Sequence, residues 1–216
     1  MNQQLAIRCF GAFSVTLAGV EVTGFESDKA RALLAFLATE SDQPHHRERL
    51  AGLLWPDFDD QAARTNLRRV LSNVRQVIGD RSSDAPALIV AGQTIQLDTA
   101  RAWVDVRAFQ ENIAADDLAQ VETAVDLYKG RFLDTLSIKE STLFDDWLTL
   151  TRSQLQQQMM GALQRLAQAF EQQDEWQKAA AFARQQLALQ PWHETAHRRL
   201  MRLLARNGRR AAALKQ

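Results

Sequence analysis

The chain has 216 residues, which is enough for one large domain or two ordinary ones, and its 46% hydrophobic content is sufficient for packed cores. Its 26 basic and 26 acidic side chains give a net charge of zero, so no overall field attracts nucleic acid. The single cysteine, Cys9, excludes an internal disulfide, and no uninterrupted apolar run at the N-terminus suggests a signal peptide or membrane anchor. We therefore expect a cytoplasmic protein with no membrane partner.

The first 25 residues are typical of β-strands. The runs LAIRCFG, FSVTLAG and VEVTG are rich in strand-forming residues and are separated by glycines. From Asp28 the periodicity becomes helical, because DKARALLAFLATE places its apolar residues on one face. Cys9 falls within a strand-like run, where a small buried apolar role is more usual than a nucleophilic one.

A second short helix, RERLAGLLW, follows a polar break and is ended by Pro56. An acidic start from Asp57 to Asp60 then favours a longer helix over residues 61–79, with Gly79 as the residue that ends it. The segments ALIV and TIQLD around AGQ predict a β-hairpin.

The helix over residues 61–79 is amphipathic, with an apolar stripe and a polar side that contains no acid. The polar side collects six residues that we predict to read bases: Thr65, Arg68, Arg69, Ser72, Asn73 and Gln76. Arg64 and Arg75 flank the stripe as candidate phosphate contacts. A basic helix face is more often simply solvated, so the assignment depends on the neighbouring elements.

Those neighbours favour DNA binding. Strands, two helices, a longer helix and a hairpin, in that order, predict a winged helix-turn-helix in residues 1–100. In such a domain the last helix enters the major groove and the hairpin is the wing. Arg47 at a helix start and Gln93 and Thr94 in the wing are further candidate phosphate contacts. The wing carries no basic residue, and residues 1–100 hold ten basic against twelve acidic side chains.

Residues 101–216 predict an all-α domain. The expected helices are 105–114, 117–129, 144–172, 174–190, 193–206 and one that starts near Arg209. A shift of 34 residues aligns Ala162 with Ala196, Arg165 with Arg199 and Leu166 with Leu200. This period is typical of tetratricopeptide repeats. Because the second copy stops within a helix, we expect the chain to be part of a longer protein.

The motif His193-Glu194-Thr195-Ala196-His197 has the spacing of a zinc protease. However, Ala196 and Leu200 are the packing positions of the repeat, and no third metal ligand follows His197. The chain also lacks a glycine-rich phosphate loop. We therefore expect no catalytic site, no metal site and no cofactor, with a zinc hydrolase as a remaining alternative.

The chain resembles a known family along its whole length. LAIRCFGAFSVTLAG, DKARALLAFLA and RERLAGLLWPD followed by ARTNLRRVLSNVRQVIG are similar to its N-terminal domain, and WVDVRAF, AVDLYKGRFLDTL, DDWLTLTRSQL and GRRAAALKQ to its second. The family is that of bacterial transcriptional activators of the Streptomyces antibiotic regulatory protein type. It joins an OmpR-like winged helix to a tetratricopeptide-like activator domain.

The resemblance implies binding to double-stranded promoter DNA, often at direct repeats occupied by two copies, and recruitment of RNA polymerase. It also implies that longer relatives continue into a nucleotide-binding ATPase. Carried over to this sequence, it assigns the recognition surface to five residues: Thr65, Arg69, Ser72, Asn73 and Arg75. The chain departs from the pattern at Ser72 and Asn73, where arginine is frequent, and in its uncharged wing. A tetratricopeptide-like scaffold with a degenerate winged helix is therefore the alternative function.

Overall fold

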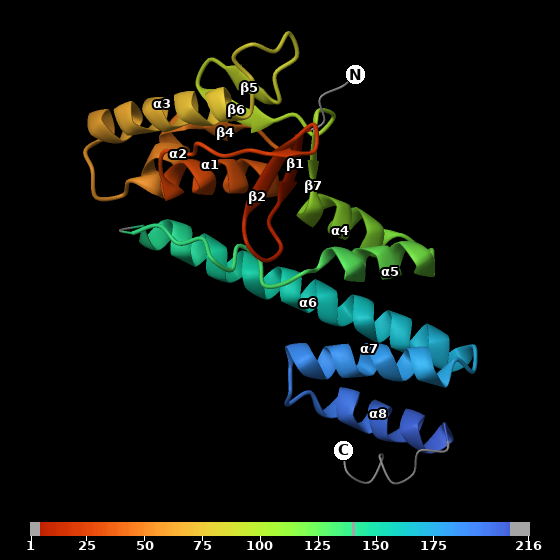
Figure 1. Ribbon diagram of the computed structural model, residues 1–216. Helices are drawn as coiled ribbons and strands as arrows, with labels where there is room; N and C mark the ends of the chain where they lie inside the picture. Colours follow the sequence, from red (N-terminus) through yellow and green to blue (C-terminus); the bar gives the residue numbers. More distant parts are fainter. Residues whose placement is uncertain (1–4, 140, 208–216) are drawn as a thin grey trace. The chain divides into compact units, whose positions relative to one another are not determined.

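A computed structural model of the protein describes residues 5–139 and 141–207, which form seven strands and eight helices (Figure 1). The residues up to 109 together with 127–152 form one compact unit, and residues 110–126 with those from 153 onward form another. Helices α4 (Asp105–Ala114) and α6 (Thr142–Gln172) contain residues of both units. The predicted helix near Arg209 lies outside the described residues.

The first unit contains a sheet whose strand order is β3-β2-β1-β7. Its strands are short: β1 (Leu5–Arg8), β2 (Ser14–Leu17), β3 (Val20–Glu21) and β7 (Ala102–Val104). β1 pairs antiparallel with β2 and parallel with β7. The sequence predicts the first three strands but not β7. Because β7 pairs with β1, the unit extends past the boundary at residue 100 that the sequence suggests for the winged helix.

A second sheet has the order β4-β6-β5. β5 (Leu88–Ala91) and β6 (Thr94–Leu97) form the predicted hairpin, with its turn at Gly92 and Gln93. The two-residue strand β4 (His45–His46) pairs with β6 and was not predicted, because two residues carry no alternating pattern. The chain passes directly from β4 into α2, so the hairpin and that helix are joined through one sheet.

Three helices build the core of the first unit: α1 (Asp28–Thr39), α2 (Arg47–Leu54) and α3 (Asp60–Val77). α1 is buried over all of Ala32–Ala38 rather than on one face only. One reason is that the ring of Trp147 packs on that of Phe36, with their centroids 5.0 Å apart. α1, which the sequence predicts to bury one face only, is therefore buried on all sides along this stretch.

A buried carboxylate joins β1 to the start of α4. Asp105 accepts hydrogen bonds from the backbone N–H groups of Cys9, Phe10 and Val106 at 2.8–2.9 Å. Burial raises the pKa of Asp105, while these backbone donors and the charge of Arg8 act against the rise. Burial, followed by the negative charge of Asp105, raises the pKa of the Cys9 thiol well above its ordinary value. Cys9 is fully buried, as the sequence predicts.

The second unit is helical. Beside the parts of α4 and α6 that belong to it, it contains α5 (Leu118–Leu127) except its last residue, together with α7 (Trp176–Leu189) and α8 (Glu194–Arg206). The aligned repeat residues play equivalent roles, since Leu166 and Leu200 are both buried. Arg165 donates to the carbonyl of Ile113 at 3.2 Å, and Arg199 donates to that of Gln164 at 3.3 Å. Each arginine thus binds backbone of a neighbouring helix, as expected for repeated helical hairpins.

Across the described part of the chain, none of the helices combines the length and the apolar character that a membrane span requires.

Candidate nucleic-acid interface

Helix α3 is delimited by caps at both ends. At its start, Asp59 accepts a hydrogen bond from the N–H of Ala62 at 2.8 Å. At its end, Gly79 has a φ of +79° and donates to Gln76, while the N–H of Asp80 returns to the carbonyl of Arg75 at 2.9 Å. These two bonds form a Schellman motif, so Gly79 ends the helix as predicted. The apolar stripe, including Leu67, Leu71 and Val74, is buried.

The side of α3 opposite this stripe is mostly solvent-exposed. We call it the polar face, and it comprises Arg64, Thr65, Arg68, Arg69, Ser72 and Gln76. All of these side chains are exposed except Ser72, which is half-buried. The Thr65 hydroxyl donates to the carbonyl of Gln61 at 2.9 Å, so its oxygen faces outward mainly as an acceptor. Five of the six residues predicted to read bases thus lie together on one surface.

Asn73 is the exception, and its placement on the exposed side was wrong. Its side chain is buried, accepts a hydrogen bond from the N–H of Glu26 at 3.1 Å and donates to the carbonyl of Gly24 at 3.2 Å. The segment before α1 therefore covers this edge of α3. Asn73 thus holds α3 against that segment through both ends of its amide.

Carboxylates accompany two arginines of the polar face. Glu48 Oε1 lies 2.7 Å from a guanidinium nitrogen of Arg64, and Glu26 Oε2 lies 3.8 Å from Nε of Arg69. All four side chains are more than half exposed, so these pairs are weak and break at little cost. Within residues 5–139 and 141–207, Arg68 has no such pair.

The two other arginines predicted to bind phosphates, Arg47 and Arg75, are half-buried. In both, Nε is buried and makes no hydrogen bond within the described residues. Each guanidinium is therefore partly desolvated. A phosphate contact by either residue stays a prediction.

The hairpin between β5 and β6 is tied to α2 by its backbone. The N–H of Arg47 donates to the carbonyl of Gln93 at 2.8 Å, and the Thr94 hydroxyl donates to the carbonyl of Ala91 at 3.0 Å. The Gln93 side chain is exposed and remains able to contact a phosphate, whereas Thr94 is half-buried with its hydroxyl proton engaged in the turn.

Lys29 adds a positive charge beside α3. Its Nζ lies 5.1 Å from the centre of the Trp55 ring, in a cleft of about 260 Å³ that Arg69 and Asn66 of α3 also line. Arg81, which follows α3, donates hydrogen bonds to Ser72 and Gln76 of the polar face. Arg81 was not among the predicted contacts, because it lies beyond the helix in sequence and only the turn at Gly79 brings it back.

The zinc-protease spacing in α8 has a structural role. His193 precedes the helix and accepts a hydrogen bond from the N–H of Ala196 at 3.1 Å, while Nε2 of His197 lies 2.7 Å from the carbonyl of Pro191. No cluster of three or more His, Cys, Asp or Glu side chains suited to a metal occurs in the portion of the chain that the structure describes. Both imidazoles thus stabilise the turn between α7 and α8.

A family model described as the bacterial transcriptional activator domain matches residues 97–216, more than half of the chain. The chain belongs to this family. The family is one of transcription regulators rather than enzymes, and the expected activator domain is thereby confirmed. The OmpR-like assignment of the N-terminal part is not tested by that model.

Comparison with curated protein sequences finds no significant match. Among solved structures, the chain is similar to EmbR of Mycobacterium tuberculosis, which was determined in complex with a low-affinity phosphopeptide. The TM-score is 0.73 at 20% sequence identity, and the match covers 98% of this chain. This likeness confirms the predicted fold, a winged helix followed by a helical domain. The chain spans 57% of the length of EmbR.

Proposed function

We propose that the protein is a sequence-specific DNA-binding transcription regulator that reads promoter DNA with the polar face of α3. The observation that carries the proposal is this face itself. It presents three exposed arginines together with short hydrogen-bonding side chains on a helix of 18 residues whose opposite side buries Leu67, Leu71 and Val74. Arginine, glutamine, serine and threonine are the residues that pair with base edges and phosphates in the major groove.

The charge pattern favours specific over non-specific binding. Because Glu26 and Glu48 partly neutralise Arg69 and Arg64, the face offers a weak general attraction to phosphates. A DNA sequence with matching base edges adds hydrogen bonds to the polar face, and Glu26 and Glu48 do not weaken these bonds. We infer that two copies side by side on direct repeats provide the affinity that one weakly charged face lacks.

The second unit is proposed to supply protein contacts. Membership in the transcriptional activator family supports activation through RNA polymerase, with the helical repeats as the surface that meets it. The proposed setting for these contacts is the cytoplasm.

The test uses DNA selected from a random pool by the full chain. Arg68→Ala should weaken binding to the selected DNA about tenfold or more, because a base-reading arginine contributes about 1–3 kcal/mol. The matched control is Arg101→Ala, since Arg101 is half-exposed in the same unit and pairs with Asp98 rather than with α3. Equal affinities of all three proteins would refute the assignment of α3, and no enrichment of any DNA would refute DNA binding.

A scaffold with a degenerate winged helix is the second candidate. The same ion pairs and the neutral hairpin Ala91–Thr94 favour it, because both weaken attraction to phosphates. Salt dependence separates the candidates. A DNA reader loses affinity steeply as salt rises, whereas a scaffold shows no saturable binding to DNA even at low salt.

A further inference from the structure

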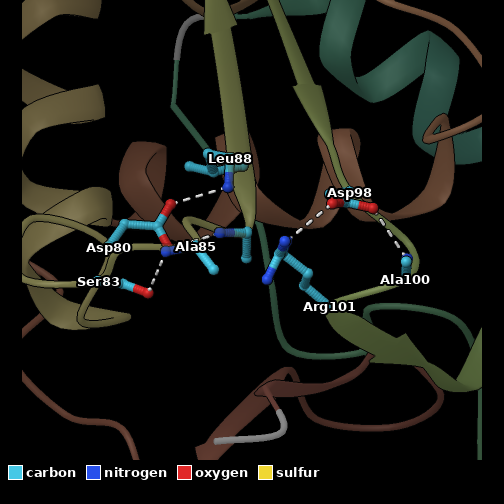
Figure 2. Close-up of polar contacts among 8 residues, drawn as sticks. Asp80, Ser83, Ala85, Leu88, Asp98, Ala100 and Arg101 are labelled. Carbon is cyan, nitrogen blue, oxygen red and sulfur yellow. Dashed lines mark hydrogen bonds and ion pairs between the residues drawn. The ribbon is translucent and has the colours of Figure 1, made fainter. Parts of the chain in front are cut away.

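Arg81 is held beside the polar face by the way α3 ends. The Schellman motif at Gly79 turns the chain back over the last turn of the helix. The next residue, Asp80, is buried and accepts hydrogen bonds from the N–H groups of Ala87 and Leu88, both at 2.8 Å. Figure 2 shows the bond to Leu88. Asp80 thus closes the loop over residues 81–86 at its base. The chain that leads into Arg81 is therefore held in place by the end of α3 and by the buried carboxylate of Asp80.

From this position the Arg81 guanidinium reaches two members of the polar face. It donates a hydrogen bond to Oγ of Ser72 and another to Oε1 of Gln76, the latter at 3.4 Å. Ser72 and Gln76 are four residues apart and so lie one above the other on α3. Arg81 is exposed, and among the described residues it is the arginine that donates hydrogen bonds to this pair. It supplies a positive charge to the C-terminal half of the face.

The two contacts also decide which groups remain available. Arg81 occupies the acceptor oxygen of Gln76 and one acceptor site of Ser72. What remains is the amide NH₂ of Gln76, the hydroxyl proton of Ser72, the unused N–H groups of Arg81 and one acceptor lone pair on each of the two oxygens. On this half of the face donors therefore outnumber acceptors.

Donors match one base better than the others. Guanine offers two adjacent acceptors, N7 and O6, in the major groove, whereas adenine offers one acceptor and one donor. A free glutamine pairs with adenine because it can both donate and accept. A glutamine whose oxygen already accepts from arginine has one of its two lone pairs taken, so it is a poorer acceptor for the adenine amine.

We propose that Arg81 belongs to the base-reading surface and, by holding Ser72 and Gln76 as donors, sets a preference for guanine at the base pair they contact. This inference rests on the proposed function, because it requires α3 to lie in the major groove. It adds a residue outside the recognition helix to the specificity of the protein.

The experiment selects bound DNA from a random pool with the full-length wild type, Arg81→Ala and the control Arg101→Ala. Arg101 is a suitable control because its guanidinium binds Asp98, 3.1 Å away, in a separate turn (Figure 2). The wild type and Arg101→Ala should select the same motif with a guanine at one position. Arg81→Ala should bind that motif about tenfold more weakly and should select adenine at the same position.

Each outcome has one meaning. An unchanged motif and affinity in Arg81→Ala would overturn the inference, and so would a loss of affinity that leaves the base preference unchanged, since that is the behaviour of a phosphate contact. If Arg68→Ala still weakens binding in either case, DNA reading by α3 stands and only the role of Arg81 fails. If the wild type enriches no motif, both proposals are overturned. Circular dichroism of each variant excludes loss of fold as the cause.

Discussion

Asn73 and Ser72 are adjacent in α3 and were both predicted to read bases, but the structure gives them opposite roles. Asn73→Ala removes a buried amide that bonds the N–H of Glu26 and the carbonyl of Gly24. At about 1 kcal/mol for each hydrogen bond, the variant should lose about 2 kcal/mol of stability. Since 1.4 kcal/mol corresponds to a tenfold change, local opening of α3 should become about 30-fold more frequent.

Hydrogen exchange of the α3 amides in the full chain measures this opening directly. Ser72→Ala is the matched control, because Ser72 is only half-buried and its removal leaves the Arg81 donor in contact with water. Its exchange rates should change by less than threefold, which corresponds to about 0.5 kcal/mol. If Asn73→Ala left exchange unchanged and abolished binding to selected DNA, the reasoning would be refuted and Asn73 would be a base contact.

Three further predictions concern charge, the helix end and the buried thiol. Replacement of both Glu26 and Glu48 by Gln should raise affinity for random-sequence DNA several-fold at low salt by releasing Arg69 and Arg64, and a binding isotherm that matches the wild type would contradict this. Gly79→Ala should lower the free energy of unfolding by about 1–2 kcal/mol, because the φ of Gly79 is positive and a Cβ there would meet Leu17 at 3.3 Å. Urea unfolding measures this loss, and Gly52→Ala is the control because a Cβ at Gly52 meets no neighbouring element within 4 Å. Cys9 should resist iodoacetamide until the protein unfolds, since burial keeps the thiol protonated in the folded state. An unfolded thiol ionises near the ordinary pKa of 9.0, so stability should fall as pH rises above that value, and Cys9→Ala should lack this slope.

Much of the fold could be predicted from local patterns. The start of α3 at an acidic cap, its end at Gly79 and the hairpin after it are all encoded within a few neighbouring residues. The 34-residue repeat was equally visible, because Leu166 and Leu200 have to be buried in each copy.

The features that were missed all depend on contacts between distant residues. β7 pairs with β1 across more than 90 residues of sequence, and the carboxylate of Asp105 binds backbone at Cys9. A helical wheel gives the direction of the Asn73 side chain but not the segment that covers it. Arg81 was missed because it follows α3 in the sequence, and only the turn after the helix brings its side chain back to Ser72.

At the tip of the hairpin, Gln93 accepts a hydrogen bond from the Arg47 N–H through its backbone carbonyl. Only the backbone of Gln93 holds α2, while its side chain is exposed and contributes nothing to that contact. A substitution at position 93 should therefore change the contact with DNA and leave the bond between the hairpin and α2 intact. Under the proposed function, arginine or lysine at this position should raise affinity for DNA, and a single codon change is enough to introduce either residue.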